Sequence, residues 1–174
     1  MGTDTRMATT QAMRDVGDDQ LPIERNFYKK MGPAILFSGW AESVPPALKD
    51  TFEASFSDVF VSQKFPDKYL HENYTYLVAN EAFNGSKDSL LLDLTATAFA
   101  RETMRIRVAI RSCVADDSTA FVVYQSSWDF VSADNIHFRE ESVRTQTWTL
   151  NSKSWQIIGE YWDSIKVEPV AKIS

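Results

Sequence analysis

The chain has 174 residues, of which 44% are hydrophobic and 24% charged, a composition that suits one globular domain with its own core. Its net charge of −6 and scattered basic residues argue against nucleic-acid binding. The single cysteine, Cys113, excludes an internal disulfide and a cysteine zinc cluster, and no apolar run is long enough to span a membrane. Without a signal-like segment, we expect a cytoplasmic protein.

The first residues predict a tail and the rest a single domain. Residues 1–20 carry too little apolar material to pack, so we expect a flexible N-terminal tail followed by one domain over 21–174. Pro33 and Gly39 interrupt any helix in the segment 21–46, and the Pro45-Pro46 step forces an extended turn. This segment is expected to form either a lid over a pocket or an arm onto a partner.

Two helices are predicted in the middle of the chain. From Ala47 onward, phenylalanines recur every four residues up to Phe60 and predict a helix with one core-facing stripe. Residues 69–78 are rich in aromatic and β-branched types and predict a strand. Asn84-Gly85 predicts a turn, and Ser86 is placed to cap a second helix that ends near Met104.

The C-terminal half predicts a sheet. Apolar residues alternate with Arg105, Arg107 and Arg111, which indicates a strand whose arginines lie on the solvated face. Residues 120–132, 136–150 and 154–165 then predict an antiparallel meander of three long strands. Helices followed by such strands indicate the α+β class, in which helices pack on one face of a curved sheet.

Several short motifs resemble SnoaL-like proteins of the NTF2-like superfamily. They are FPDKYLHEN at 65–73, FNGSKDSL at 83–90, RTQTW at 144–148 and SWQIIGEYWDS at 154–164. The resemblance covers about residues 47–167. Gly159 and Tyr161 depart from it, because relatives often carry histidines at those positions.

The resemblance implies a cone of curved, mixed or antiparallel sheet wrapped around N-terminal helices, commonly as a homodimer, with a small-molecule pocket inside. It implies a cofactor-independent isomerase, cyclase or dehydratase of secondary metabolism that acts by proton transfer on a small, largely apolar metabolite. The alternative is a non-catalytic module of the same fold that binds small molecules or oligomerises. The missing histidines and the absence of a sharp catalytic signature favour that alternative.

Asp163 and His71 are the catalytic candidates. Asp163 follows Tyr161 and Trp162 on the predicted last strand, where aromatic neighbours would desolvate its carboxylate and make it a useful base. It also resembles the proton-transfer aspartate of SnoaL-type cyclases. An imidazole exchanges protons near neutral pH, which makes His71 a possible partner. A solvated aspartate and a structural histidine are the alternative interpretations.

Strict alternation along the last strand predicts that the two acids lie on opposite faces. It places Asp163 on the face of Trp155 and Tyr161, and Glu160 on the opposite face with Trp162. Only one of the two acids can therefore face a pocket.

Further residues are predicted to bind the substrate. Aromatic side chains would form its wall, Asp129 would supply a polar contact, and Arg144 would steady an enolate or a carboxylate. The full set is Tyr74, Tyr76, Tyr124, Trp128, Asp129, Arg144, Trp155 and Tyr161. A surface ion pair is the alternative for Arg144.

No metal or organic cofactor is expected. His71 and His137 lack the spacing of a helical metal pair, and no phosphate-binding or dinucleotide-binding glycine motif occurs. His137 follows a hairpin-turn composition and is expected to be exposed.

Overall fold

The computed structural model describes residues 33–62, 67–79, 84–88, 102–132 and 134–172. Within these ranges the elements follow the chain as strands, one long helix, a short 3₁₀ turn and further strands. In order they are β1 (Ala34–Ser38), α3 (Pro46–Ser62), η2 (Asp67–Tyr69), β2 (Leu70–Val78), β3 (Asn84–Ser86), β4 (Glu102–Ala115), β5 (Thr119–Val131), β6 (Ile136–Asn151) and β7 (Ser154–Lys172).

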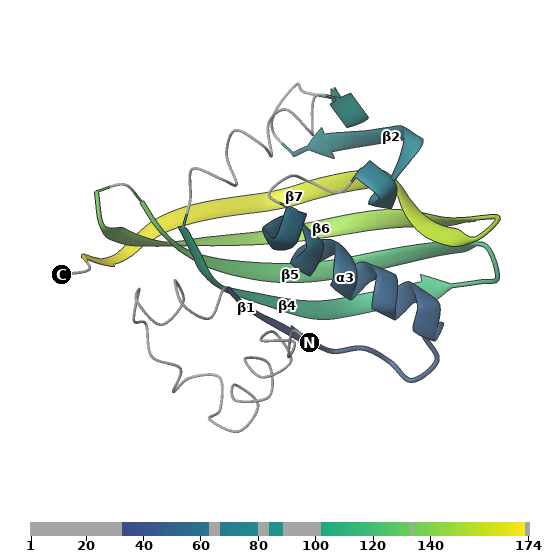
Figure 1. The fold of residues 1–174 in the computed structure, drawn as a ribbon, viewed down its shortest axis with the longest axis horizontal. Coiled ribbons are helices and arrows are strands. Elements are labelled where there is room, and N and C mark those ends of the chain that lie inside the picture. Colours follow the sequence, from purple (N-terminus) through teal and green to yellow (C-terminus); the bar gives the residue numbers. More distant parts are fainter. Residues whose placement is uncertain (1–32, 63–66, 80–83, 89–101, 133, 173–174) are drawn as a thin grey trace.

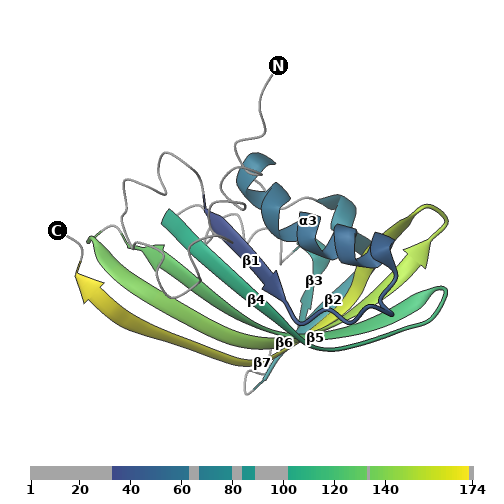
Figure 2. The same cartoon turned by 90° about the horizontal axis from the view of Figure 1, so that it is seen from below.

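The strands form one mixed, 7-stranded sheet with the order β1-β4-β5-β6-β7-β2-β3. The long strands β4 to β7 run antiparallel to one another, whereas β1 pairs parallel with β4 and β2 pairs parallel with β7. Figure 1 shows these long strands side by side with α3 crossing them. In Figure 2 the sheet is strongly curved, and α3 lies across its concave side.

The helix α3 packs through its phenylalanines. Pro46 occupies its first position, where a missing N–H costs nothing, and the carbonyl of Pro45 accepts from the amides of Leu48 and Lys49. Phe52 is fully buried and contacts Tyr124 edge to face with ring centroids 5.3 Å apart. Burying such a ring stabilises the fold by about 2 kcal/mol.

The two faces of the sheet are distinguished by this helix. Tyr124 and Trp148 contact Phe52, so their side of the sheet is the inner face. Ala120 and Val122 are fully buried on that side, while Phe121 between them is 51% exposed on the opposite, outer face.

Three β-bulges break the alternation along β7, and two of them lie close to Glu160. Thr147 pairs with Gly159 but Trp148 pairs with Ile157, which leaves Ile158 without a partner on β6. In the same way Val143 pairs with Ser164 and Arg144 with Trp162, so Asp163 is the extra residue. Each bulge reverses the faces of the residues that follow it.

Most of the predicted strands are confirmed, as is the helix from Ala47. Asn84-Gly85, predicted as a turn, instead belongs to β3, which pairs with β2 through Tyr76 and Gly85. The strand β1 was not expected, because Pro33 and Gly39 seemed only to interrupt a helix. Gly39 follows β1 with φ +84°, where an added Cβ would collide with the carbonyl of Ile110.

The expected wrapping of the sheet around several N-terminal helices is not confirmed. Within the described ranges the sheet meets the single long helix α3. The predicted tail at 1–20 and most of the predicted second helix lie outside the described residues. The fold is therefore shown as a curved mixed sheet with a helix on its concave side.

Candidate functional site

The inner face carries a connected group of polar and aromatic side chains centred on Glu160. Tyr74 Oη donates to Glu160 Oε2 at 2.6 Å, and Gln146 Nε2 donates to Glu160 Oε1 at 2.7 Å. Trp148 Nε1 donates to Gln146 Oε1 at 3.0 Å and so fixes the orientation of that amide. We call Tyr74, Tyr124, Arg144, Gln146, Glu160 and Trp162 the Glu160 cluster. Its members come from β2, β5, β6 and β7.

Both tyrosines of the Glu160 cluster stay neutral. Burial, followed by the charge of Glu160, raises the pKa of Tyr74 far above its usual value of about 10. Burial and the Glu160 carboxylate likewise raise the pKa of Tyr124. Tyr74 is 1% exposed and Tyr124 2%, so each hydroxyl remains a hydrogen-bond donor at working pH. A half-buried carboxylate is thus held in place by neutral donors.

Arg144 and Trp162 form a stacked pair beside Glu160. The guanidinium carbon of Arg144 lies 4.4 Å from the centroid of the Trp162 ring, and Tyr76 stacks on the same indole with ring centroids 5.0 Å apart. Because β6 and β2 flank β7 on opposite sides, Trp162 lies between the arginine and the tyrosine. A fixed cation and an indole therefore lie next to the carboxylate.

Two buried donors of this pair have no hydrogen-bond partner. They are Nε of Arg144 and Nε1 of Trp162. Burial lowers the pKa of Arg144, but Tyr124, Glu160 and Glu140 outweigh that effect and leave the pKa raised, so the guanidinium is fixed as a cation. Arg144 forms a long ion pair, 3.9 Å from its Nη2 to Glu140 Oε1. An unpaired buried donor is costly, and an oxygen acceptor on a ligand would satisfy it.

The bulge at Ile158 explains why Glu160 rather than Asp163 belongs to this site. Without it, strict alternation would turn Glu160 and Trp162 away from Ile157 and Trp155. The extra residue places all of them on the inner face. Only one of the two acids faces inward, as expected, and that acid is Glu160; the sequence alone left open which of the two it would be. The alternation of apolar and polar residues in one sequence does not show where a bulge will form.

Asp163 does not have the environment that was expected of it. It is the extra residue of the second bulge, and its side chain is exposed. The aromatic neighbours Tyr161 and Trp162 point to opposite faces of the sheet, so they do not enclose the carboxylate. Desolvation of Asp163 is therefore not observed.

His71 lies near the start of β2, away from the Glu160 cluster. Its Nδ1 accepts a 3.1 Å hydrogen bond from the backbone amide of Asn73, and its side chain is half-buried. This is a local contact within one strand, so the structure does not bring His71 together with Glu160 or Asp163.

The predicted substrate-binding residues divide between the two faces. The inner face holds Tyr74, Tyr76, Tyr124, Trp128, Arg144 and Trp155, all within or packed against the core or the Glu160 cluster. Tyr161 lies on the outer face and is 39% exposed, because the bulge at Ile158 reverses its position. Sequence reasoning missed Gln146 as a site residue and placed Glu160 and Trp162 on the wrong face.

Asp129 belongs to a separate buried ionic cluster on the face of β5 opposite Tyr124. Its carboxylate accepts from Arg105 Nε and Arg139 Nε at 3.0 Å each and from His137 Nε2 at 2.7 Å. These donors, led by His137, outweigh the effect of burial and hold the pKa of Asp129 below its usual range.

This cluster corrects two expectations. Arg105 is 4% exposed and His137 1%, so neither is solvated as predicted. The reason is the register of the sheet, which places both beside the buried carboxylate of Asp129.

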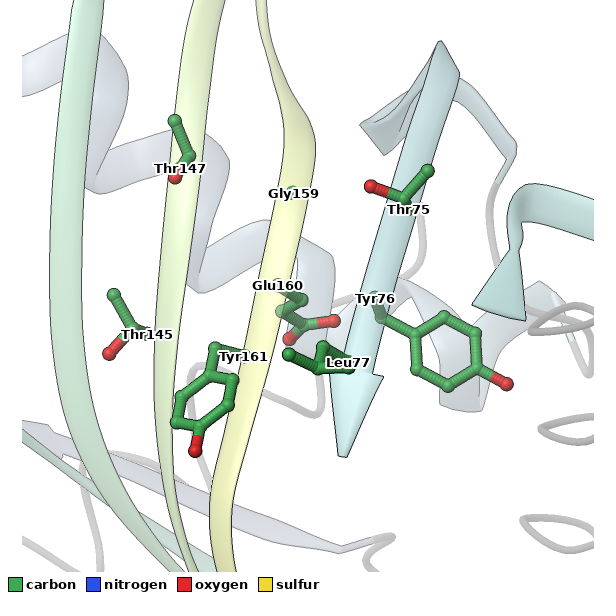
Figure 3. Close-up of a pocket in the computed structure, with 8 residues that line it drawn as sticks. All are labelled: Thr75, Tyr76, Leu77, Thr145, Thr147, Gly159, Glu160 and Tyr161. Carbon is green, nitrogen blue, oxygen red and sulfur yellow. The ribbon is translucent and has the colours of Figure 1, made fainter. Parts of the chain in front are cut away.

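The outer face carries a groove of about 400 Å³ above β6, β7 and β2. Figure 3 shows Gly159 at its floor, between Thr147 on β6 and Thr75 on β2, with Tyr161 and Leu77 at its lower end. The missing side chain of Gly159 makes the hollow, since an added Cβ would meet nothing closer than 4.0 Å. Neither Asp163 nor His71 lines this groove.

The groove belongs to a wider surface without charged residues. Cross-strand partners on the outer face form rows, of which one is Val114, Phe121, Thr147, Gly159 and Thr75. We define the outer-face patch as Thr75, Leu77, Ala109, Ser112, Val114, Thr119, Phe121, Val123, Gln125, Val143, Thr145, Thr147, Thr149, Gln156, Gly159 and Tyr161. Arg111 lies at its margin and donates to the amide oxygen of Gln125.

Within the described part of the chain, no group of three or more histidine, cysteine, aspartate or glutamate side chains is arranged to hold a metal ion. Across the same residues, no helix combines the length and the apolar character that crossing a membrane requires.

Comparison with solved structures identifies the fold. A conserved protein from Planctomyces limnophilus DSM 3776 aligns over 71% of this chain and 95% of its own, with a TM-score of 0.56 at 10% identity. A ketosteroid isomerase-like protein from Erwinia carotovora atroseptica SCRI1043 gives a TM-score of 0.56 at 11% identity, covering 71% of this chain and 97% of its own.

A hexachlorocyclohexane dehydrochlorinase, LinA-type3, from Novosphingobium barchaimii LL02 covers 73% of this chain and 90% of its own, with a TM-score of 0.54 at 11% identity. No family model matches the chain, and no curated protein matches it in sequence. The predicted resemblance is confirmed at the level of structure: the chain has the NTF2-like fold that isomerase-like and dehydrochlorinase proteins share.

Proposed function

We propose that this protein is a cofactor-independent enzyme that moves a proton on a small, largely apolar carbonyl compound bound at the inner face. Glu160 is the group that takes and returns the proton, in an isomerisation, cyclisation or dehydration. The observation that carries this proposal is the half-buried Glu160 carboxylate, which neutral donors hold among aromatic rings. A carboxylate in such surroundings is a common general base for carbon acids.

The hydrogen bonds to Glu160 orient its carboxylate but leave some of its lone pairs unused. An ionised carboxylate has about four lone-pair positions, and Tyr74 and Gln146 use one on each oxygen. A remaining lone pair can accept the proton from the carbon next to the substrate carbonyl. The same group then returns the proton to another carbon in an isomerisation, or the electron pair expels a leaving group in a dehydration.

Arg144 and Trp162 supply the other half of the chemistry. When the proton leaves, negative charge develops on the substrate oxygen, and the unpartnered Nε of Arg144 and Nε1 of Trp162 are the donors for it. Glu140 and Glu160 lie near Arg144, so a neutral carbonyl suits this position better than a ligand that is already anionic. Tyr76, which stacks on Trp162, forms an apolar wall beside it.

The fold neighbours support this class of chemistry without defining the substrate. One of them is described as ketosteroid isomerase-like and another as a hexachlorocyclohexane dehydrochlorinase. The roles first assigned to Asp163 and His71 pass in this proposal to Glu160 and to the Arg144–Trp162 pair, because those groups converge on one face.

The test uses 2-tetralone, a small apolar ketone with acidic α-protons, and follows their replacement by deuterium in D₂O by NMR. The wild-type protein is expected to accelerate exchange. Glu160→Gln keeps the shape of the side chain but replaces one acceptor oxygen with an amide NH2, and it is expected to lose roughly 100-fold or more of that rate. Circular dichroism controls for folding. Equal rates for the two proteins would contradict the proposal, as would exchange no faster than in buffer for 2-tetralone and for simple cyclic enones.

A second candidate is an association module, with or without ligand binding. The outer-face patch favours it, because exposed apolar side chains such as Phe121 and Leu77 lie in a part of the outer face whose cross-strand rows contain no charged residue. The two candidates are compatible, and we propose that the protein acts as a homodimer.

A further inference from the structure

We propose that the C-terminal part of β7 is a docking edge for a second copy of this chain, whose own β7 pairs with it antiparallel about a twofold axis at Val167. We call residues 163–171 the free β7 edge. This inference names a surface for the proposed homodimer and rests on it. It depends neither on the chemistry assigned to Glu160 nor on the outer-face patch.

The strand β2 covers only the first part of this side of β7. It pairs with β7 from Ile157 to Trp162, and as β2 ends the amide of Ala79 donates to the carbonyl of Trp162 at 2.8 Å. Figure 1 shows β7 continuing beyond β2 toward the C-terminus. Within the described residues, no strand pairs with this side of β7 after Trp162, and residues 165–171 are exposed. Such an edge is a template for a further strand.

Every second backbone unit of the free β7 edge points away from β6. The carbonyl of Trp162 points toward β2, and the bulge at Asp163 takes up one residue of β7. By the alternation of an antiparallel ladder, the outward orientation then returns at Ile165, Val167 and Pro169, whose partners on β6 lie an even number of positions from that of Trp162. Proline has no N–H to give to a ladder, so an outward position suits Pro169.

A twofold axis at Val167 gives these outward groups reciprocal partners. Each Val167 amide donates to the carbonyl of the partner's Val167, and each Ile165 amide donates to the carbonyl of the partner's Pro169. Isologous contacts require this reciprocity. The bulges at Asp163 and Val170 bound the paired stretch, and Pro169 disfavours registers that place it at the centre. The edge is therefore suited to one closed pair rather than to open-ended stacking.

The side chains of the free β7 edge are complementary to themselves in this register. Lys166 Nζ and Glu168 Oε1 lie 2.8 Å apart on the outer face, on either side of Val167 in sequence. The antiparallel pairing places Lys166 opposite the partner's Glu168, which joins two ion pairs into a group of alternating charges. On the inner face, Val167 (46% exposed) meets the partner's Val167, and Ile165 (44% exposed) meets the partner's Pro169.

This pattern selects a second copy over an unrelated extended peptide. A matching strand must carry an acid and a base on one face, in the antiparallel order, with apolar residues between them on the other face. The strand β7 itself meets these conditions. The chain carries a net charge of −6, so two copies repel each other where acidic surfaces meet, whereas Lys166 and Glu168 balance at this edge.

Disulfide formation tests the register. In a Cys113→Ser background, Val167→Cys places its sulfur on the axis, where directly paired Cα atoms lie about 5.5 Å apart. Val170→Cys is the matched control, because Val170 is 47% exposed on the same strand yet lies roughly 20 Å from its own copy. Mild oxidation is expected to give a covalent dimer of the Val167→Cys protein and none of the Val170→Cys protein. Disulfide dimers of both, of neither, or of Val170→Cys alone would overturn the proposed pairing.

Charge complementation tests the partner. In the Cys113→Ser/Val167→Cys background, Lys166→Glu and Glu168→Lys each place like charges opposite each other, so each variant alone is expected to form the disulfide roughly 10-fold more slowly or worse. An equal mixture of the two restores opposite charges and should give the mixed disulfide at the parent rate, as identified by mass spectrometry. Circular dichroism controls for folding. Unchanged rates in the single variants, or a loss that mixing does not reverse, would refute the self-complementary edge.

Sedimentation equilibrium of the wild-type protein separates this inference from the proposed homodimer. A dimer is expected. A monomer would refute both proposals, whereas a dimer whose Val167→Cys variant forms no disulfide would refute the edge alone. The 2-tetralone assay of the Glu160→Gln protein decides the chemistry separately.

Discussion

At the scale of single residues, the site depends on which of two acids turns toward the helix. Glu160 and Asp163 are three positions apart on one strand, and only Glu160 contacts Tyr74 and Gln146. Both tyrosines of the cluster are held neutral, and the arginine beside them is held charged. The site thus combines one acceptor for a proton with fixed donors for an oxygen.

Replacing Arg144 with lysine keeps the positive charge but removes the planar stack on Trp162 and the Nε donor. We expect 2-tetralone exchange to fall roughly 100-fold in kcat with a smaller change in KM, because the lost hydrogen bond matters most when charge develops on the oxygen. Steady-state kinetics by NMR measures this. An unchanged kcat would remove Arg144 from the proton-transfer step.

The raised pKa values of Tyr74 and Tyr124 predict a loss of stability in alkali. Each group ionises at lower pH when unfolded than when folded, so its contribution is complete below the unfolded value of about 10 and is lost as pH rises above it. Ultraviolet titration to pH 11 should leave these two tyrosines protonated until unfolding. In the Tyr74→Phe protein, one fewer tyrosine should ionise at the pH of unfolding. Ionisation of every tyrosine near the usual pKa of about 10, before the protein unfolds, would contradict the burial of Tyr74 and Tyr124.

At the scale of elements, the ends of β4, β5 and β6 are joined by the buried ionic cluster. Asp129 on β5 accepts from Arg105 on β4 and from His137 and Arg139 on β6. Removing the carboxylate that these three donors share takes a charged acceptor away from the buried Arg105 guanidinium, which is costly in the interior.

We therefore expect Asp129→Asn to lower the free energy of unfolding at pH 7 by about 3 kcal/mol, as measured by urea denaturation. The pKa of Asp129 is lowered in the folded state, so its contribution is present above the unfolded value of about 4 and is lost as pH falls below it. The difference from wild type should shrink in acid. Asp163→Asn, at an exposed bulge, should change stability by less than about 0.5 kcal/mol, and equal losses in the two variants would refute the role of Asp129.

Hydrophobic periodicity predicted the long helix and strands, but it assigned side chains to the wrong face where a β-bulge interrupts the alternation. The stripe of α3 and the alternation of β5 and β6 follow directly from the sequence, because burial of one face imposes a repeat. The bulges at Ile158 and Asp163 do not, since an extra residue depends on pairing with β6. In the sequence, His137 looks like a polar residue beside a turn. Its burial depends on the hydrogen bond to Asp129, and the two residues come together only when β5 pairs with β6.

At the scale of the whole molecule, the curved sheet separates two surfaces with different uses. The concave side, covered by α3 in Figure 2, holds the Glu160 cluster, and the convex side holds the outer-face patch. Gly159 and Glu160 are adjacent in sequence yet serve opposite faces, because neighbouring strand residues point in opposite directions. Dimerisation through the outer face would therefore leave the inner site free.

The measurement that tests the account most directly is the rate of 2-tetralone deuteration by Glu160→Gln and Asp163→Asn, compared side by side with wild type. The two variants make the same acid-to-amide change on one strand, at an inward-facing position for Glu160 and at a bulge for Asp163. The structure predicts that Glu160→Gln loses roughly 100-fold or more while Asp163→Asn keeps the wild-type rate. Loss in Asp163→Asn with full activity in Glu160→Gln would contradict the inward position of Glu160 as the origin of the chemistry.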